Sequence, residues 1–270
     1  MKNSKKTNTL LWQVSPREGG PVSYLFGTMH TRDLRAFTWL DLAYARIEQC
    51  EVFAAEYNFS QTDSAALATA LLLPEGTTLD QLLSRRAWKN LAFYAKRKLD
   101  LPPETLRQAH PMYVQMVLTT ALLREEAPYP LDEALWMYAL NKGKSITGLE
   151  TFEEQLEVLR RIPLEDQLKS LTYFLKHYRR QRERLKAMLR WYQEGNIRSL
   201  YQASRRDARW LRRPLLLERN VRMAKRFAEI AHRQSLFGAV GAAHLAGGKG
   251  MLRLLKQAGF RIKPILLHVS

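Results

Sequence analysis

Two histidines near opposite ends of the chain occur in the same short pattern, Gly-x-x-His, shortly after an apolar run. His30 follows the apolar residues 22–26, and His244 follows the apolar residues 236–240. An apolar run that gives way to glycine is typical of a buried strand ending in a loop. Two imidazoles brought together would favour a metal site or a proton-transfer site. Such short matches also arise by chance, and either histidine could instead be purely structural.

Two carboxylates occupy similar positions. Glu56 directly follows the apolar residues 52–55, and Glu150 follows the strand-like segment 144–149. A carboxylate buried at a strand end must be paired, hydrogen-bonded or bound to a metal, because burying it alone is costly. Both glutamates are therefore candidate site residues. For Glu56 the alternative is a salt bridge to one of the many arginines.

Strand ends in an α/β sheet converge on one rim, so we expect His30, His244, Glu56 and Glu150 to lie close together. Such a set suits a hydrolytic metal site, which has three protein ligands, an open position for water and a further acid as general base. The same set without a metal could hold a catalytic His-Glu pair. The residue types leave both possibilities open.

The elements that must position these residues are indicated by turn residues and by hydrophobic periodicity. Residues 10–14 and 22–26 predict a hairpin around a loop rich in Pro and Gly, and 260–269 predict a last strand. A helix is predicted from about 39 to 49. Further helices are predicted over residues 65–73, 79–83, 88–98, 112–123 and 131–140, over one long segment from 164 to 192, and over 214–230.

These elements predict an α/β fold with a mixed central sheet built from both ends of the chain and a large α-helical insertion. We expect a single domain over residues 1–270. Its α/β core would comprise about residues 8–60, 142–155 and 216–270, and its helical layer about 61–140 and 156–215.

Composition limits the class of protein. The 270 residues are 46% hydrophobic, which is enough to fill a core, and no apolar stretch is long enough to span a membrane. Residues 10–14 are too short an apolar run to serve as a signal peptide after the basic opening. The single cysteine, Cys50, agrees with a reducing compartment. We therefore predict a cytoplasmic protein.

The formal net charge of +17 raises the possibility of nucleic-acid or anionic-surface binding. The basic residues concentrate in 176–190 and 198–213, but no helix-turn-helix, zinc-finger or RNA-recognition signature accompanies them. Tyr178 and Tyr192 fall on the apolar stripe of their helix, so they are expected to be packed and not free to stack on bases. A solvated helix face is the favoured interpretation of this charge.

Several short motifs, taken together, resemble the TraB/GumN family, which is related to the Tiki metalloproteases and more distantly to erythromycin esterases and a haem-binding lipoprotein. The motifs are Tyr-Leu-Phe-Gly-Thr-Met-His at 24–30, Leu-Pro-Glu-Gly-Thr-Thr-Leu at 73–79, Gly-Leu-Glu-Thr at 148–151, Glu-Arg-Asn at 218–220 and Gly-Ala-Ala-His-Leu-Ala-Gly at 241–247. The resemblance implies that His30 and His244 are paired motif histidines, that Glu56 is the shared acid, and that Arg219 and Asn220 line the site.

The expected function is that of a metal-dependent hydrolase acting on peptide or amide bonds, or on another small-molecule substrate. A divalent ion of the Mn, Co or Zn class would use His30, His244 and Glu56, with Glu56 as ligand or base and Glu150 beside it. Arg219 could stabilise an oxyanion or only pair a glutamate. The rival hypothesis is a binding protein that holds a small molecule, haem or a peptide without turnover.

Three departures from the family pattern limit what carries over. An export signal, common in the family, is not recognised here. Its Pro-Trp appears as Pro111-Met112, and Asp132 stands where glycine is usual. The last two changes fall in the predicted helical region, so the substrate cannot be transferred from the family.

Overall fold

The computed structural model of the chain describes residues 8–207 and 213–267. These residues form two compact units. One comprises residues 8–60, 126–152, 188–207 and 213–267 and contains the sheet; the other comprises residues 61–125 and 153–187 and is helical. The predicted arginine-rich block 198–213 and the predicted strand 260–269 lie partly outside the described residues.

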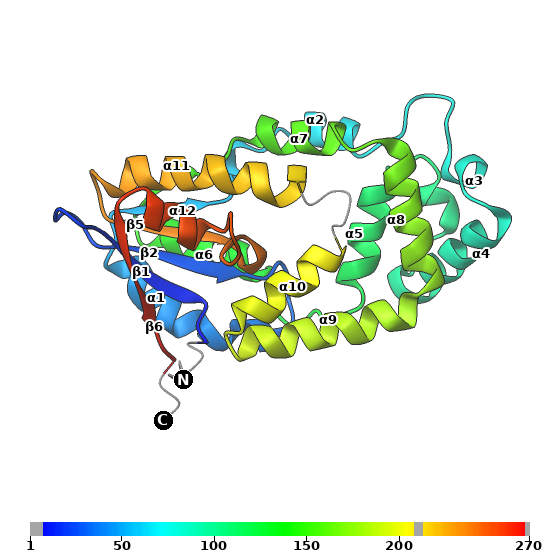
Figure 1. Ribbon diagram of the computed structural model, residues 1–270. Coiled ribbons are helices and arrows are strands. Elements are labelled where there is room, and N and C mark those ends of the chain that lie inside the picture. The colour runs from blue at the N-terminus through cyan, green and yellow to red at the C-terminus, as the bar shows by residue number, and fades with distance from the viewer. Residues whose placement is uncertain (1–7, 208–212, 268–270) are drawn as a thin grey trace. The chain divides into compact units, whose positions relative to one another are not determined.

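The sheet has six strands in the order β4-β3-β5-β2-β1-β6. The strands are β1 (Leu11–Pro16), β2 (Ser23–Thr28), β3 (Val52–Ala55), β4 (Ser145–Gly148), β5 (Leu236–Gly241) and β6 (Phe260–Ile265). The four strands β4, β3, β5 and β2 are parallel, whereas β1 is antiparallel to both β2 and β6. Figure 1 shows β6, near the C-terminus, beside β1, near the N-terminus. The predicted mixed sheet from both chain ends and the predicted hairpin are therefore confirmed.

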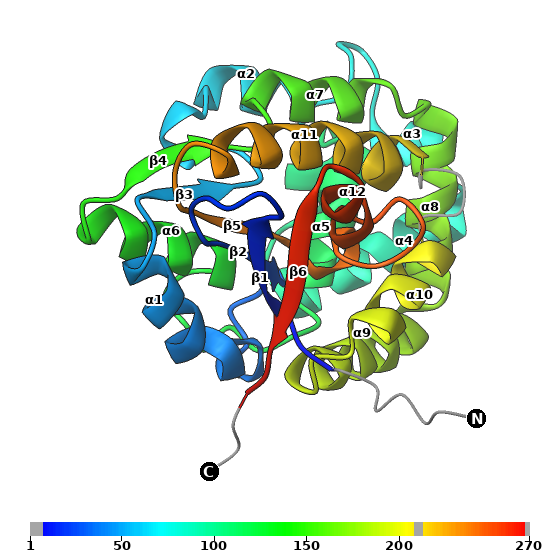
Figure 2. The same ribbon diagram turned by 60° about the vertical axis from the view of Figure 1, so that its left-hand side comes forward.

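The central strand β5 is buried on both faces, as its uninterrupted apolar sequence requires. Phe237 points to one face, where its ring stacks on Phe53 with centroids 5.9 Å apart. Leu236 and Val240 belong to the cluster on the opposite face, which α11 (Arg219–Ala231) and α12 (Met251–Gln257) cover. Figures 1 and 2 show α1 (Leu40–Glu48) and α6 (Leu131–Asn141) on the other side of the sheet.

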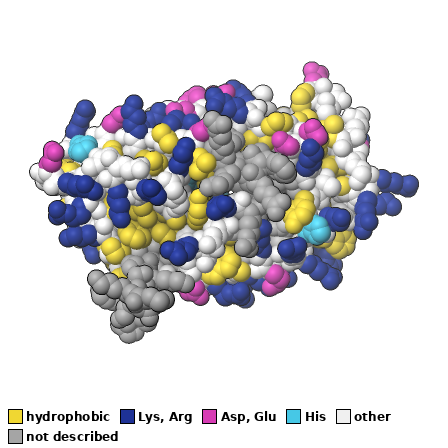
Figure 3. Space-filling model, viewed as in Figure 1, with side chains coloured by type: hydrophobic (Ala, Val, Ile, Leu, Met, Phe, Trp, Pro, Cys, Tyr) yellow, Lys and Arg dark blue, Asp and Glu magenta, His cyan; other side chains and the backbone are white. Residues whose placement is uncertain are grey.

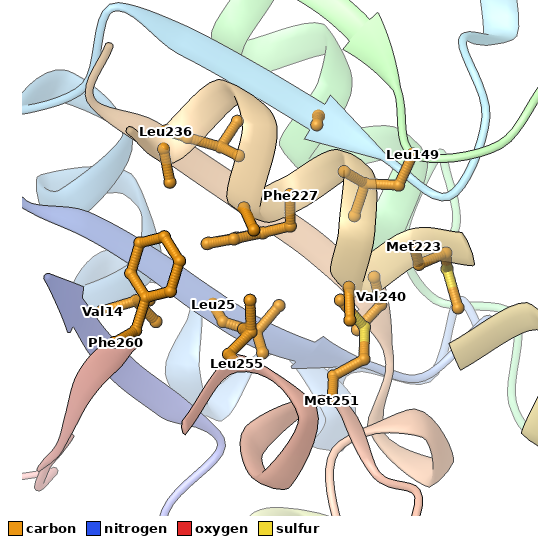
Figure 4. Close-up of a cluster of buried hydrophobic side chains, with 14 of the residues drawn as sticks. Val14, Leu25, Leu149, Met223, Phe227, Leu236, Val240, Met251, Leu255 and Phe260 are labelled. Carbon is orange, nitrogen blue, oxygen red and sulfur yellow. The ribbon is translucent and has the colours of Figure 1, made fainter. Parts of the chain in front are cut away.

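The core between the sheet and α11 and α12 is apolar throughout. Figure 4 shows Phe227 of α11 and Leu255 of α12 directed at Leu25 and Val240 of the sheet. All four side chains are fully buried. Burying a side chain of this size stabilises the fold by about 1.5–3 kcal/mol. The core thus fixes α11, whose first residues carry part of the candidate site.

The sheet unit contains further short helices. They are η1 (Leu34–Trp39), α10 (Ile197–Asp207), η5 (Arg213–Glu218) and η6 (Ala242–His244), and the unit also takes the C-terminal part of α9 (Tyr178–Gln193). Tyr192 on α9 is fully buried and donates a hydrogen bond of 2.7 Å to the carbonyl of Gly27. That bond attaches α9 to the loop that leads toward His30.

The helical unit packs around a second apolar core. Its elements are α2 (Ser64–Ala70), α3 (Leu79–Leu82), α4 (Arg85–Tyr94), η3 (Ala95–Leu99), η4 (Pro103–Leu106), α5 (Pro111–Thr120), α7 (Phe152–Arg160), α8 (Leu164–Lys176) and the start of α9, while η2 (Phe59–Gln61) lies at the boundary of the two units. Leu91, Val114 and Leu171 are fully buried in this core. Tyr94 stacks on Tyr178 with centroids 3.8 Å apart.

Three details differ from the sequence prediction. The long helix predicted from 164 to 192 is two helices, α8 and α9, because His177 leaves helical geometry at φ −115° and ψ 26°. The helix predicted over 214–230 begins with η5, so that Arg219 is the first residue of α11. The helix α10 was not predicted. Within the described residues, no helix combines the length and apolar character needed to cross a membrane.

Candidate functional site

The candidate residues follow the carboxyl ends of adjacent parallel strands, as predicted. Glu56 comes directly after β3, and Glu150 lies between β4 and α7. His30 lies two residues beyond β2, and His244 lies in η6, three residues beyond β5. Because β2 and β3 both pair with β5, the sheet brings all four segments to one edge.

The glycines of the two Gly-x-x-His motifs allow close approach. A Cβ at Gly27 would lie 3.1 Å from Cα of Ala242, so the first motif packs directly against the second. A Cβ at Gly241 would lie 3.2 Å from Oε1 of Glu56 and 3.5 Å from the ring of His244. Glycine at these positions is therefore required by packing around the site.

A network of two glutamates and two arginines lies at this edge. Arg219 donates from Nε to Glu150 at 2.7 Å and from Nη2 to Glu56 at 2.5 Å. Arg222, one turn further along α11, donates to the other oxygen of Glu150 at 2.7 Å. The Glu150 side chain is 0% exposed, so its charge requires these partners. Arg219 thus pairs both glutamates.

Glu56 is held ionised by this network. Burial alone would raise the pKa of its carboxyl, but Arg219, His244 and the backbone N–H of Gly241 outweigh burial and lower the pKa to about 2. The Gly241 amide donates to Oε1 at 2.8 Å, and Arg219 binds Oε2. At neutral pH Glu56 is therefore a carboxylate, and both of its oxygens accept hydrogen bonds.

His244 is buried, and its ring orientation is set by Asn220, the second residue of α11. Asn220 donates from Nδ2 to the carbonyl of Lys249 at 2.7 Å, which directs its Oδ1 to Nδ1 of His244 at 2.5 Å. An amide oxygen only accepts, so Nδ1 must carry the proton. Burial is the main cause that lowers the pKa of His244. The neutral ring consequently presents a lone pair at Nε2.

A second acceptor lies near this lone pair. Nε2 of His244 lies 3.6 Å from Oε1 of Glu56. Two acceptors placed opposite each other repel unless a proton or a cation lies between them. Metal ligands bound at about 2.0–2.2 Å from one ion lie at comparable separations, so these two atoms fit a cation. Within residues 8–207 and 213–267, however, no group of three or more His, Cys, Asp or Glu side chains could hold a metal ion.

His30 has a different environment. Its side chain is 62% exposed, and its Nδ1 contacts both carboxylate oxygens of Asp132 at 2.9 and 3.0 Å. The hydrogen bond to Asp132 is the main cause that raises the pKa of His30, and the negative charges of Glu133 and Glu56 act in the same direction. The structure thus pairs His30 with Asp132 and His244 with Asn220.

Two residues of the site were not predicted as such. Arg222 lies three residues after Arg219, and residues at this spacing share a helix face, so helical periodicity could have indicated it. In the sequence, Asp132 is marked only by replacing the glycine that is usual in the family. No pattern in the sequence connects it with His30, which lies 102 residues away.

The basic surface of α8 and α9 was the other candidate. Arg179, Arg180 and Arg182 are exposed, whereas Lys186 pairs with Glu183 at 2.9 Å. Tyr178 and Tyr192 are buried, as predicted, so they do not offer rings for base stacking. Figure 3 shows basic side chains spread over the visible face among acidic and apolar ones.

The chain is similar to known proteins over nearly its whole length. The chain is 25% identical to Metalloprotease TIKI2 of Danio rerio, over 97% of this chain and 62% of that protein. It is 22% identical to the Metalloprotease TIKI homolog of Nematostella vectensis, over 97% of this chain and 68% of the relative. No solved structure matches it significantly. The model of the TraB/PrgY/gumN family matches residues 10–264, and the chain therefore belongs to that family.

Proposed function

We propose that this chain is a metal-dependent hydrolase of peptide or amide bonds, with its site at the carboxyl ends of β2, β3 and β5. The proposal is carried by two acceptors, His244 Nε2 and Glu56 Oε1, which lie 3.6 Å apart. The relatives named metalloproteases support the same class of reaction.

His244 and Glu56 would hold the ion. His30 is the proposed third ligand, because it follows β2, which pairs with β5. A divalent ion of the Mn, Co or Zn class would polarise a substrate carbonyl and lower the pKa of a bound water. Three protein ligands and one open position are the usual arrangement of a catalytic zinc site.

The remaining residues prepare these groups. Asn220 keeps the proton of His244 on Nδ1. Nε2 can then coordinate a metal ion or accept a proton from an attacking water. Arg219 holds Glu56 ionised and links it to Glu150. Because its guanidinium is shared between two carboxylates, we assign Arg219 to fixing Glu56. The predicted oxyanion role would require substrate to displace one of these carboxylates.

Binding without turnover is the second candidate, and one observation favours it. The charges of Glu56 and Glu150 are balanced by Arg219 and Arg222, so the network needs no reacting partner to satisfy it. A small molecule, haem or a peptide would then use the same edge of the sheet.

The test compares metal content and hydrolysis in the full chain. Protein stripped with a chelator is reloaded with Mn²⁺, Co²⁺ or Zn²⁺ and incubated with a mixed peptide library, and cleavage is followed by mass spectrometry. We expect cleavage only after reloading, and a loss of at least about 100-fold in His244→Ala and in His30→Ala. His232→Ala is the matched control, because His232 packs against Phe260 away from the candidate residues.

The outcomes separate the two candidates. Ion binding that depends on His244 but produces no cleavage would support the binding protein. If the wild type binds none of the three ions and the double variant His30→Ala with His244→Ala alters neither activity nor ligand affinity, both candidates are wrong.

A further inference from the structure

The two motif histidines are oriented in the same way, each by a side chain that contacts Nδ1. Nδ1 of His244 contacts Asn220, the second residue of α11, and Nδ1 of His30 contacts Asp132, the second residue of α6. In both cases the imidazole lies two or three residues beyond a strand, and its hydrogen-bonding partner lies in the first turn of a helix. The two helices are far apart in sequence, so the likeness does not follow from a local motif.

Asp132 determines which nitrogen of a neutral His30 carries the proton. An ionised carboxylate only accepts hydrogen bonds, and both of its oxygens lie within 3.0 Å of Nδ1. Nδ1 is therefore the donor, and the lone pair of the neutral ring lies on Nε2. The start of α6 is also tied to the histidine loop, because the N–H of Leu131 donates to the carbonyl of Thr31 at 3.2 Å.

We propose that Asp132 is a positioning residue for His30, as Asn220 is for His244, and that together they present both imidazoles through Nε2. One part of the inference rests on the proposed function, namely that the two Nε2 atoms bind the same metal ion or act on the same proton. Hydrogen bonds from the second nitrogen of a histidine commonly fix the tautomer and orientation of a metal ligand.

Burial explains why the partner of His244 is an amide, Asn220, whereas the partner of His30 is a carboxylate, Asp132. His244 is buried beside Glu56 and Glu150, where a third carboxylate would be costly, so a neutral amide is the partner that the site can accept. Asp132 has a side chain that is 21% exposed, and it faces a histidine that is itself exposed. A carboxylate keeps part of its hydration there, and it binds the imidazole N–H more strongly than an amide does.

The tautomer can be measured without any activity assay. Long-range ¹H–¹⁵N correlation spectra of the full chain, labelled with ¹⁵N-histidine and held near pH 9, distinguish the Nδ1–H from the Nε2–H form of a neutral imidazole. His30→Gln identifies the signals of His30. We expect the Nδ1–H form in the wild type, a shift toward the Nε2–H form in Asp132→Leu, and retention of the Nδ1–H form in Asp132→Asn, which keeps an acceptor.

Glu133→Gln is the matched control. Glu133 follows Asp132 on α6 and adds a negative charge near His30, but the contact with Nδ1 comes from Asp132. This variant should leave the tautomer unchanged. An unchanged tautomer in a folded Asp132→Leu variant, or an equal shift in Glu133→Gln, would overturn the proposal. If Asp132→Leu does not fold, Asp132→Ser replaces it, because the shorter serine side chain withdraws the acceptor from Nδ1. The tautomer of His30 should again shift toward the Nε2–H form.

Zn²⁺ titration of the chelator-stripped chain gives the second measurement. We expect Asp132→Leu to weaken Zn²⁺ binding by about 10- to 100-fold, with partial recovery in Asp132→Asn and no change in Glu133→Gln. A tautomer that shifts as expected, combined with a wild type that neither binds Zn²⁺ nor cleaves peptide, would leave Asp132 as the positioning residue and reject the proposed function. The two failures are thus distinguishable.

Discussion

Both motif histidines lie just beyond parallel strands at the same edge of the sheet, but His244 is buried whereas His30 is exposed. His244 is buried and contacts Asn220, and it lies beside Glu56, which Arg219 links to Glu150. His30 is 62% exposed, and its hydrogen-bonding partner among the described residues is Asp132.

This difference indicates on which part of the site the stability of the fold depends. We call the residues around His244 the buried half and the pair His30 and Asp132 the exposed half. Removing one member of a buried ion network leaves an unpaired charge in the interior, whereas removing an exposed pair returns both groups to water. We therefore expect changes at the buried half to alter stability and function together. Changes at the exposed half should alter function alone.

Arg219→Met should produce the largest effect. It leaves Glu56 without its main cation and Glu150 with Arg222 as its remaining arginine, so the free energy of unfolding should fall by about 3–5 kcal/mol. Urea denaturation at pH 7 measures this change. Arg107→Met, which removes an exposed pair with Asp80, is the control and should change stability by less than about 1 kcal/mol. Equal losses in the two variants would remove the distinction between buried and exposed ion pairs.

The second prediction concerns acid pH. The pKa of Glu56 is about 2 in the fold and 4.5 as its ordinary value, so its stabilising contribution is complete above about pH 4.5 and is lost as the pH falls toward 2. Below pH 4.5 the unfolded chain binds a proton that the folded chain does not. Wild type should therefore lose stability more steeply than Glu56→Gln, by up to about 1.4 kcal/mol per pH unit. Parallel pH profiles of the two proteins would contradict the assignment.

Asn220→Ala should have a smaller effect. It removes the acceptor of His244 Nδ1 and the donor to the Lys249 carbonyl, and a buried polar group without a partner costs about 1–3 kcal/mol. Thermal and urea unfolding measure this loss. Asn58→Ala is the comparison, since the half-buried Asn58 side chain bonds only Ser60 among the hydrogen bonds described, just before η2. A loss at Asn220 no greater than at Asn58 would show that the amide does not hold His244.

The smallest stability effect is expected at the exposed half. His30→Ala and Asp132→Asn should each change the free energy of unfolding by less than about 0.5 kcal/mol, because His30 is exposed and asparagine at 132 keeps an acceptor for Nδ1. Peptide cleavage should nevertheless be lost in His30→Ala. A destabilisation of His30→Ala comparable with that of Asn220→Ala would mean that the exposed half is part of the folding core.

The strand ends could be predicted because their signals are local. The apolar runs before His244 and Glu56 have the length and composition of buried strands, and the carboxyl ends of parallel strands share one edge by geometry. The break between α8 and α9 could not be predicted in the same way. The apolar spacing continues across His177, and the sequence has neither proline nor glycine there.

By itself, the sequence determined the chemistry available to this protein: two histidines and two glutamates placed just beyond strands, with an arginine and an asparagine in a predicted helix. The tertiary structure decided how these groups are paired. Arg219 bridges Glu56 and Glu150, Asn220 orients His244, and Asp132 reaches His30 across 102 residues. Such pairings depend on where separate helices begin relative to the sheet edge. That placement is set by packing around the core, which local periodicity does not encode.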